Sequence, residues 1–370
     1  MDLTVLGGGH GAFAAAAALA ERGHTVRWWR RDAPALTALR QRGTLGLRDH
    51  RGLRQVPVGA AARAGAIRAV PDLAEAVRGA RLVVVPLPAT AHEELASRVA
   101  PLLGDGQVVL LPPGTFGTVV FAKAMAAAGN RADAAFAESG TLPYLARTRG
   151  PDEVAVSAYA TRLPTGVLPA RSAGAAFRVL RQAYPAVEPV GDCLSGALMN
   201  AGPVIHPPLL LMNAGPLEHG TSWDLHDEGT QPSVRRVTDT LDAERIAVRE
   251  ALGYGAPHFP LADHYATAGE EWMYGRAAHG KLTGSGDWRE PIDLLGHRYM
   301  REDTCLGLSF LVSVGRWAGC PTPVARGLLS LASAVTGTDL YARGRTLESL
   351  ALAGLTRPAL KKLLDEGFPV

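Results

Sequence analysis

The chain has 370 residues, which is too long for one average domain and suits two. Apolar residues make up 47% and charged residues 20%, which is typical of a globular protein and excludes a disordered or membrane-spanning chain. The net charge is only +3 and arginines are scattered among acids, so no stripe for nucleic acid is present and no such partner is expected.

The start of the chain predicts neither export nor a membrane anchor. Asp2 stands where a signal peptide has basic residues, and glycines soon interrupt the apolar run. No apolar run approaches the roughly 18 residues of a membrane span. Cys193, Cys305 and Cys320 are widely spaced and lack C-x-x-C pairing, which favours neither disulfides nor zinc. A cytoplasmic protein without membrane contact is expected.

A glycine-rich turn at residues 7–12 lies between an apolar run at 3–6, which predicts a strand, and an alanine-rich run at 12–20, which predicts a helix. It fits G-x-G-x-x-G/A, in which the first glycine makes the turn, the second admits a pyrophosphate and the third position keeps helix and sheet close. Free amides and the positive dipole end of the helix attract the anion. The turn residues assigned to a dinucleotide are Gly7, Gly9, His10, Gly11 and Ala12.

The end of the second predicted strand, at 23–29, bears on which dinucleotide is bound. A fold of this type usually has an acid there, about 20 residues past the glycines, that binds the ribose 2′-hydroxyl. This chain has Arg30 and Arg31, and guanidinium groups suit phosphate, so we predict NADP with NAD as the alternative. In the alternative interpretation, Arg30 and Arg31 are solvated charges that do not bind the cofactor. Asp32 either caps a helix at 34–42 or is a displaced ribose ligand.

The remainder of the first half alternates short apolar strands with helices. Strands are predicted at 43–47 and 53–58, as a hairpin, and at 66–70, 82–85, 107–111 and 154–158, the last of the sheet; helices are predicted at 72–77 and 170–184. This alternation indicates an α/β Rossmann domain, doubly wound and with a mainly parallel sheet, over residues 1–188.

Two prolines and one acid at predicted strand ends are assigned to the cofactor. Pro86 follows the strand at 82–85, and Pro113 follows the strand at 107–111. Ligands bind outside the carboxyl ends of parallel strands, so both prolines should border the dinucleotide. For Glu138 two roles stay open, because its carboxylate either contacts nicotinamide or substrate or caps a neighbouring helix.

The second half, residues 189–370, changes to helical periods and predicts an all-α domain that binds substrate. One helical face carries Val234, Val237, Leu241, Val248 and Leu252. His206 precedes Pro207 and Pro208, so we expect the helix to break or kink beside it. From the residues alone, His206 is either a core residue or a catalyst, and Asp303 is either a surface acid or its partner.

Several motifs occur in the order seen in the octopine/nopaline dehydrogenase family, which the chain resembles over nearly its whole length. They are the glycine turn, Asn-Ala-Gly-Pro-Val-Ile-His-Pro at 200–207, and the segments 241–245, 301–303, 321–323 and 344–348. The resemblance implies a cleft between a Rossmann and a helical domain, with His206 as the catalytic histidine and Asp303 as its partner. The family often has asparagine four residues before that histidine, where this chain has Gly202, and Asn200 is out of register.

The resemblance also implies a reaction. An amino acid or other amine joins a 2-oxo acid, and NADPH reduces the resulting imine to a secondary amine. His206 would exchange the proton at the carbonyl or imine centre, while Asp303 fixes its tautomer and stabilises imidazolium. Two alternatives are an NADP-dependent reductase of a simple 2-oxo or hydroxy acid and a non-catalytic dinucleotide-binding module, the latter motivated by Gly202. The sequence leaves open whether the protein forms a homodimer.

The arginines and the other histidines leave two further questions. A 2-oxo acid needs a cationic clamp, for which the candidates by position are Arg147, Arg298, Arg301 and Arg316. Other histidines lack the paired spacing of a metal motif, so we interpret most of them as loop histidines and expect no metal; they are His219, His226, His258 and His264.

Overall fold

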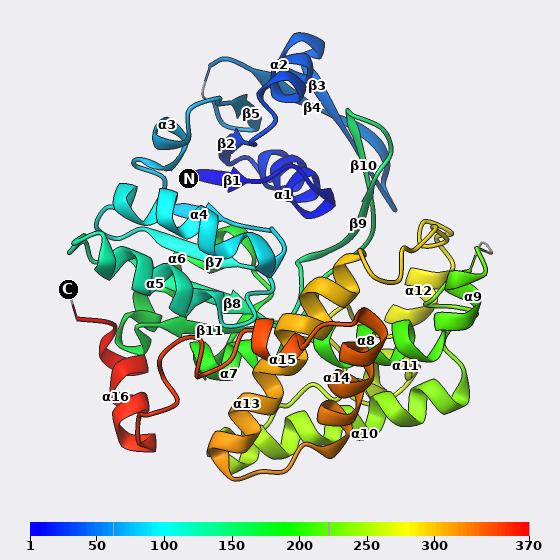
Figure 1. Cartoon of the computed structure of the whole chain (residues 1–370). Coiled ribbons are helices and arrows are strands. Elements are labelled where there is room, and N and C mark those ends of the chain that lie inside the picture. Colours follow the sequence, from blue (N-terminus) through cyan, green and yellow to red (C-terminus); the bar gives the residue numbers. More distant parts are fainter. Residues whose placement is uncertain (62, 221–222, 370) are drawn as a thin grey trace.

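A single mixed sheet forms the first half of the chain, and helices form the second half (Figure 1). The structure, a computed structural model, describes residues 1–61, 63–220 and 223–369. The sheet order is β12-β11-β8-β7-β6-β1-β2-β5-β4-β3-β10-β9. The strands are β1 Asp2–Leu6, β2 Thr25–Trp29, β3 Thr44–Asp49, β4 Gly52–Gly59, β5 Ala66–Ala69, β6 Leu82–Val84, β7 Val108–Leu111, β8 Ala135–Ser139, β9 Tyr144–Thr148, β10 Glu153–Tyr159, β11 Leu163–Leu168 and β12 Val187–Asp192.

The central strands β6, β1 and β2 are parallel, as are β6, β7 and β8, which confirms the mainly parallel Rossmann sheet. The predicted hairpin is β3 and β4. Strands β11 and β12 were not predicted, so 154–158 is not the last strand, and β12 crosses the expected boundary at 188. Each of these strands contains a proline and a glycine, which weaken the sequence pattern of a strand; they are Pro164, Gly166, Pro189 and Gly191. A Cβ on Gly166 would overlap the backbone of Asp192.

Small side chains allow helix α1 to lie deep in the first domain. Residues 11–20 of α1 are all buried, and six of the residues from 12 to 18 are alanine. The helix contacts β2 and also β9 and β10, which curve past it in Figure 1. The helices of this half are α1 His10–Glu21, α2 Ala33–Arg42, α3 Leu73–Val77, η1 Ala89–Ala91, α4 His92–Val99, η2 Ala100–Leu102, α5 Gly117–Ala127, η3 Ala170–Ser172 and α6 Ala173–Ala183.

After β12 the described chain contains helices and no strand. They are α7 Cys193–Ala197, α8 Gly202–Met212, α9 Ala214–Glu218, α10 Pro232–Ala251, α11 Ala262–Tyr265, α12 Ala278–Thr283, the π-helix η4 Tyr299–Leu308, α13 Ser309–Ala318, α14 Pro323–Thr336, α15 Leu340–Arg343 and α16 Arg357–Glu366. A break or a kink was predicted beside His206, and the break is wrong, since α8 continues through Pro207 and Pro208. Packing against η4 and α10 stabilises this helix despite the N–H groups that the prolines lack.

The end of the chain returns to the first domain. Helix α16 packs on η3 and β11, which places the C-terminal residues beside the far edge of the sheet in Figure 1. In the described parts of the chain, no helix is both long and apolar enough to cross a membrane.

Candidate active site

The glycine turn joins β1 to α1 and has the geometry of an anion-binding turn. Gly7 has a φ of +131°, which side chains rarely adopt, and its N–H donates to the carbonyl oxygen of Trp29 at 2.9 Å. A Cβ on Gly11 would lie 3.2 Å from the side chain of Pro86, so the turn lies close to the loop after β6. Among the described residues no side chain caps the first turn of α1, so its amides remain for an anion.

A hollow of about 230 Å³ lies at the end of β2, beside the glycine turn. The Arg30 side chain lines it, is 16% exposed and lies 3.5 Å from Asp32. Arg31 is 82% exposed and 3.7 Å from Glu94. Asp32 accepts a hydrogen bond from the N–H of Ala35 at 3.0 Å, which supports its role as the cap of α2.

Arg98 of α4 also lines this hollow, with its guanidinium carbon 5.2 Å from the Trp29 ring centroid. The sequence prediction missed Arg98, because nothing in the spacing of α4 shows that its exposed face meets the end of β2. Leu87 lines both the hollow and the larger cleft described next, with the glycine turn between them. The hollow, the turn and the cleft thus follow one another along the carboxyl ends of the strands, where ligands of Rossmann folds bind.

The cleft between the two domains has a volume of about 260 Å³. On the side of the first domain it is lined by five of the residues assigned to the cofactor, Gly9, His10, Gly11, Pro86 and Pro113. Ala12 is buried against the sheet instead. The Nδ1 atom of His10 accepts the N–H of Thr148 at 3.0 Å, so its Nε2 carries the proton of the neutral ring. Burial lowers the pKa of His10 and favours that neutral form.

Glu138 is fully buried and does not line the cleft, which corrects its assignment to the cofactor. Its Oε2 accepts the N–H of Phe116 at 2.7 Å, and its Oε1 accepts the hydroxyl of Thr118. The carboxyl group therefore caps the start of α5, the second role that the sequence left open. Burial raises the pKa of Glu138 to about 7.

The catalytic pair predicted from the resemblance is assembled by two helices in contact. The Nδ1 atom of His206, on α8, lies 2.7 Å from Oδ2 of Asp303, on η4. The histidine ring stacks on Tyr299, with centroids 3.7 Å apart and planes 10° from parallel. Glycine allows this closeness, because a Cβ on Gly307 of η4 would overlap Pro203 of α8. The arrangement leaves Nε2 of His206 available to the cleft that it lines.

Burial sets the protonation of this pair. Burial, followed by the charges of Arg298 and Arg147, lowers the pKa of His206 well below 6.5. Burial raises the pKa of Asp303 to about 7, against the opposing charge of Arg298. The neutral imidazole is thus favoured, and it gains an orienting acceptor when Asp303 is ionised.

The π-helix η4 brings a second acid beside Asp303. Its i→i+5 hydrogen bonds widen each turn, so residues four and five positions ahead both lie over Arg298. The Arg298 Nη1 atom is 3.5 Å from Glu302 and 3.9 Å from Asp303. Glu302 also accepts the N–H of Ala89, after β6, at 2.8 Å. Burial and the charge of Asp303 raise the pKa of Glu302 to about 7.

The glycine that departs from the family pattern is explained by its contact with the pair. A Cβ on Gly202 would overlap Oδ1 of Asp303, so this site has no room for an asparagine side chain at 202. Asn200 lines the cleft, accepts the N–H of Gly202 at 3.0 Å and donates to Thr115 Oγ1 at 2.9 Å. Asn200 therefore links the start of α8 to the loop after β7.

The structure separates the four clamp candidates. Arg147 and Arg298 line the cleft, whereas Arg301 is exposed outside it and Arg316 pairs with Glu348. The Arg147 guanidinium lies 3.6 Å from the ring centroid of Trp288. Of the four candidates, Arg147 and Arg298 are therefore the two that line this cleft, and both already face protein acids: Arg147 donates to Glu290 at 2.9 Å, and Arg298 lies beside Glu302 and Asp303.

Aromatic rings cover the helical side of the cleft, and the sequence prediction missed them. This aromatic wall consists of His226, His264, Tyr265, Trp272, Tyr274 and Trp288, and the aliphatic Leu282 lines the cleft with them. His219, His226 and His258 lie in loops, as predicted for most of these histidines, whereas His264 lies on α11. His226 and His264 are buried in the cleft, and His219 is exposed. His258 accepts a hydrogen bond from Arg249 at 3.2 Å. Within the described ranges, no three His, Cys, Asp or Glu side chains are grouped to hold a metal ion.

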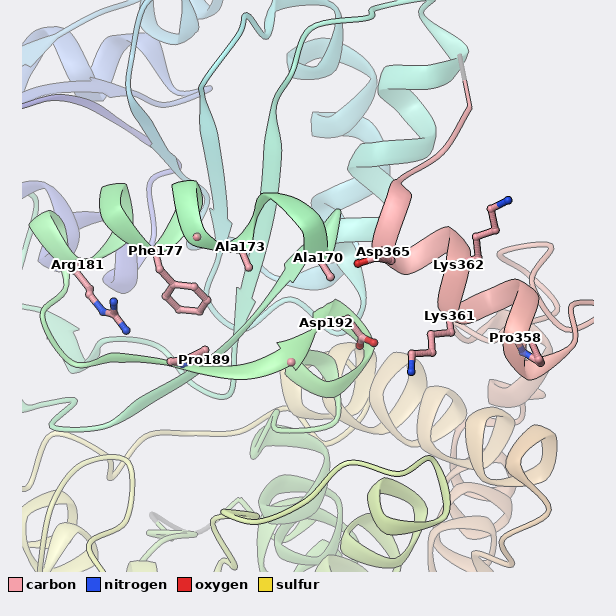
Figure 2. A pocket seen from close by; sticks show the side chains of 12 residues that line it. Ala170, Ala173, Phe177, Arg181, Pro189, Asp192, Pro358, Lys361, Lys362 and Asp365 are labelled. Carbon is pink, nitrogen blue, oxygen red and sulfur yellow. The ribbon is translucent and has the colours of Figure 1, made fainter.

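A second hollow, of about 880 Å³, lies between α6, β12 and α16 (Figure 2). Its charged side chains have both signs: Arg181, Lys361 and Lys362 against Asp192 and Asp365. The Asp192 carboxylate already caps α7 and accepts the Tyr254 hydroxyl at 2.7 Å. None of the described residues assigned to the cofactor or to catalysis lines this hollow, so it is separate from the active site.

Two family models match the two halves of the chain. The model described as NAD/NADP octopine/nopaline dehydrogenase, alpha-helical domain, matches residues 189–336. The model described as NAD-dependent glycerol-3-phosphate dehydrogenase N-terminus matches residues 2–114. An opine dehydrogenase of Arthrobacter sp. (strain 1C) is 30% identical over 98% of this chain and 98% of its own length.

Solved structures share the fold. Octopine dehydrogenase in complex with NADH and L-arginine has a TM-score of 0.72 and 18% identity, over 100% of this chain and 98% of that chain. Yersinopine dehydrogenase with NADP+ bound has a TM-score of 0.61 and 14% identity, over 99% of this chain and 98% of that chain. The full-length relative and the matching helical domain show that the chain belongs to the octopine/nopaline (opine) dehydrogenase family and is an NAD(P)-dependent oxidoreductase acting on CH–NH donors.

Proposed function

We propose that the enzyme condenses an amino acid bearing an apolar side chain with a 2-oxo acid and reduces the product with NADPH. The observation that carries this proposal is the His206–Asp303 pair, which faces the cleft where the nicotinamide end of a dinucleotide fits. The choice of NADPH is supported by Arg30, Arg31 and Arg98, which surround the hollow at the end of β2. The proposed compartment is the cytoplasm, which suits three free cysteines.

His206 moves the protons of the condensation. With Asp303 ionised, Nδ1–H of His206 donates to Oδ2, and Nε2 takes a proton from the substrate ammonium group. The freed amine attacks the carbonyl carbon of the 2-oxo acid, and a C–N bond forms. Imidazolium returns this proton to the carbonyl oxygen, which gives a carbinolamine. His206 then transfers a second proton from the nitrogen to the hydroxyl oxygen, so that the C–O bond breaks, water leaves and a protonated imine remains. The bound cofactor supplies the hydride that reduces the C=N bond.

Two cations suit the two carboxylates that such a condensation brings together. Arg147 and Arg298 line the cleft, and guanidinium groups bind carboxylates through paired hydrogen bonds. We therefore assign to them the carboxylates of the amino acid and the 2-oxo acid.

The aromatic wall supports an apolar side chain on the amine. Among the described cleft residues the only carboxylates are Glu302 and Asp303, and these face Arg298. Arg147 lies over Trp288, and Arg235 lies over Tyr265 at 4.2 Å, so cations already stack on this wall. Burial of a guanidinium or ammonium side chain without an acid partner is costly, whereas apolar surface is stabilised there.

A screen of cofactor oxidation tests the proposal. Amino acids are combined with pyruvate, 2-oxoglutarate or glyoxylate, and NADPH absorbance is followed. We expect oxidation that requires both substrates, with kcat/KM for phenylalanine or leucine about tenfold above that for arginine. Oxidation with a 2-oxo acid alone would establish the simple reductase. NADPH binding without oxidation by any pair would establish the non-catalytic module, and a preference for arginine would refute the apolar side chain.

A further inference from the structure

The segment 344–348 carries a buried arginine that no step above uses. Arg345 follows α15 in the helical half, yet its side chain is 2% exposed and lies against loops of the first domain. Its Nη1 donates to the carbonyl oxygens of Thr115 at 3.0 Å and Gly114 at 3.4 Å. Its Nη2 donates to the carbonyl oxygen of Ala89 at 2.9 Å and to Glu93 at 2.7 Å. One guanidinium therefore joins two separate loops.

These two loops form part of the cofactor side of the cleft. Ala89 follows β6 in the loop that contributes Pro86, and Thr115 follows β7 in the loop that contributes Pro113. Strands β6 and β7 are neighbours in the sheet, so Arg345 sets the spacing of two adjacent strand ends. Ligands of Rossmann folds bind beside such ends.

The same loops are tied to the helices that carry the catalytic pair. The N–H of Ala89 donates to Glu302, next to Asp303 on η4. The Thr115 hydroxyl accepts from Asn200, whose side chain also holds the N–H of Gly202 at the start of α8. Arg345 thus completes two links between cofactor loops and catalytic helices, one through each loop.

The backbone of Arg345 is itself anchored on the helical domain. A Cβ on Gly344 would overlap the side chain of Ser309, so the chain lies directly on the start of α13. The N–H of Leu347 donates to the Ser313 hydroxyl at 2.9 Å. This anchor gives Arg345 a defined position relative to α8 and η4.

We propose that Arg345 is a positioning residue that holds the loops after β6 and β7 in place relative to the His206–Asp303 pair. Its planar guanidinium donates in several directions at once, which the single ammonium of lysine cannot reproduce at the same positions. The proposal rests on the proposed function, because it concerns the alignment of the cofactor with the substrate in the same cleft.

Arg345→Met tests this role, with Arg343→Met, an exposed arginine two residues earlier, as the matched control. We expect kcat of Arg345→Met to fall about 100-fold, because small misplacements far from the reacting atoms can cost this much. The kinetic isotope effect with NADPH deuterated at the transferred position should rise, since a misaligned hydride transfer becomes rate-limiting. Arg345→Lys should recover part of kcat, and the control should match the wild type.

Thermal melting measures the folded fraction and separates alignment from stability. A lower Tm with unchanged kcat per folded molecule and an unchanged isotope effect would overturn the proposal. If Arg345→Met does not fold, the kcat, isotope effect and Tm of Arg345→Lys test the proposal instead. If no pair of amino acid and 2-oxo acid supports NADPH oxidation by the wild type, the proposed function is refuted, but the role of Arg345 can still be tested. In that case a fluorescence titration measures NADPH affinity. An affinity about tenfold weaker in Arg345→Met than in the wild type supports the positioning role, and an unchanged affinity overturns it.

Discussion

The two sides of the cleft are built in different ways. The cofactor side is built mainly from two short local segments, the turn at 7–12 and the charged residues at 30–32, with Pro86, Arg98 and Pro113 added from elsewhere in the first domain. The catalytic side joins His206 to Asp303, 97 positions later, through the packing of two helices. A local pattern is enough for the first kind of site, whereas the second depends on tertiary contacts.

The two sides also differ in exposure. Arg31, at the cofactor hollow, is 82% exposed, so solvent and salt weaken its electrostatic contribution. The Asp303 side chain is 4% exposed, and burial strengthens its interaction with the histidine. Substitutions in the catalytic pair should therefore have larger effects than substitutions in the cofactor hollow.

The largest effect is expected for His206→Asn. Loss of the proton carrier should lower kcat about 1,000-fold, within the range typical of general acid–base catalysis. NADPH affinity should change less than twofold, because the cofactor turn lies on the other domain. Steady-state kinetics and a fluorescence titration measure the two effects, with the exposed His219→Asn as control. A kcat within tenfold of the wild type would contradict the assignment.

Asp303→Asn should lower kcat about 100-fold and change the pH profile. Burial raises the pKa of Asp303 to about 7, so the ionised form needed for catalysis is lost as the pH falls through 7. In wild-type enzyme, the acid limb of kcat/KM should lie near that pH, and the variant should lack it. Glu302→Gln should keep the limb, although Glu302 also has a pKa raised to about 7.

The same pKa predicts an opposite trend for stability. A folded-state pKa above the ordinary 3.8 means that the folded protein binds this proton more tightly than the unfolded chain does. The stabilisation is complete below about pH 4 and is lost as the pH rises through 7. Asp303→Asn should therefore have the higher Tm at pH 8, measured by scanning fluorimetry. An equal or lower Tm would show that the carboxylate is well paired when ionised.

Arg30→Met should separate the two nicotinamide cofactors. We expect the KM for NADPH to rise about tenfold and the KM for NADH to stay within twofold, because only NADPH carries a 2′-phosphate for the guanidinium. Arg31→Met should have a smaller effect, since Arg31 is far more exposed than Arg30. Equal losses with both cofactors would mean that Arg30 contacts a part that they share.

The smallest effect is expected for Gly202→Ala. The added methyl group would displace Asp303 and should lower kcat about fivefold through a disturbed hydrogen bond to His206. Gly215→Ala is the control, because a Cβ there meets nothing within 4 Å in the described structure. An unchanged kcat in both variants would show that the pair tolerates a shift of the Asp303 carboxylate.

Some residues were misplaced by sequence reasoning because their partners are distant in the chain. Glu138 stands at a strand end, as a cofactor ligand would, but the start of α5 lies directly over it and receives its carboxyl group. His226 does lie in a loop, but its spacing did not reveal that it lines the cleft together with His264 of α11. Local spacing does not reveal which side chains meet across two domains.

The sequence by itself determined the parts whose physics is local: the strand–turn–helix of the cofactor turn and the parallel order implied by alternating strands and helices. For Asp32 it left two roles, of which the structure shows the helix cap. Family motifs then pointed to His206 and Asp303. Only the tertiary structure decided that these two meet, that Gly202 makes room for them, and that Arg345 joins two cofactor loops. The physical reason is that burial, which shifts the pKa values and excludes side chains, results from packing between segments far apart in the chain.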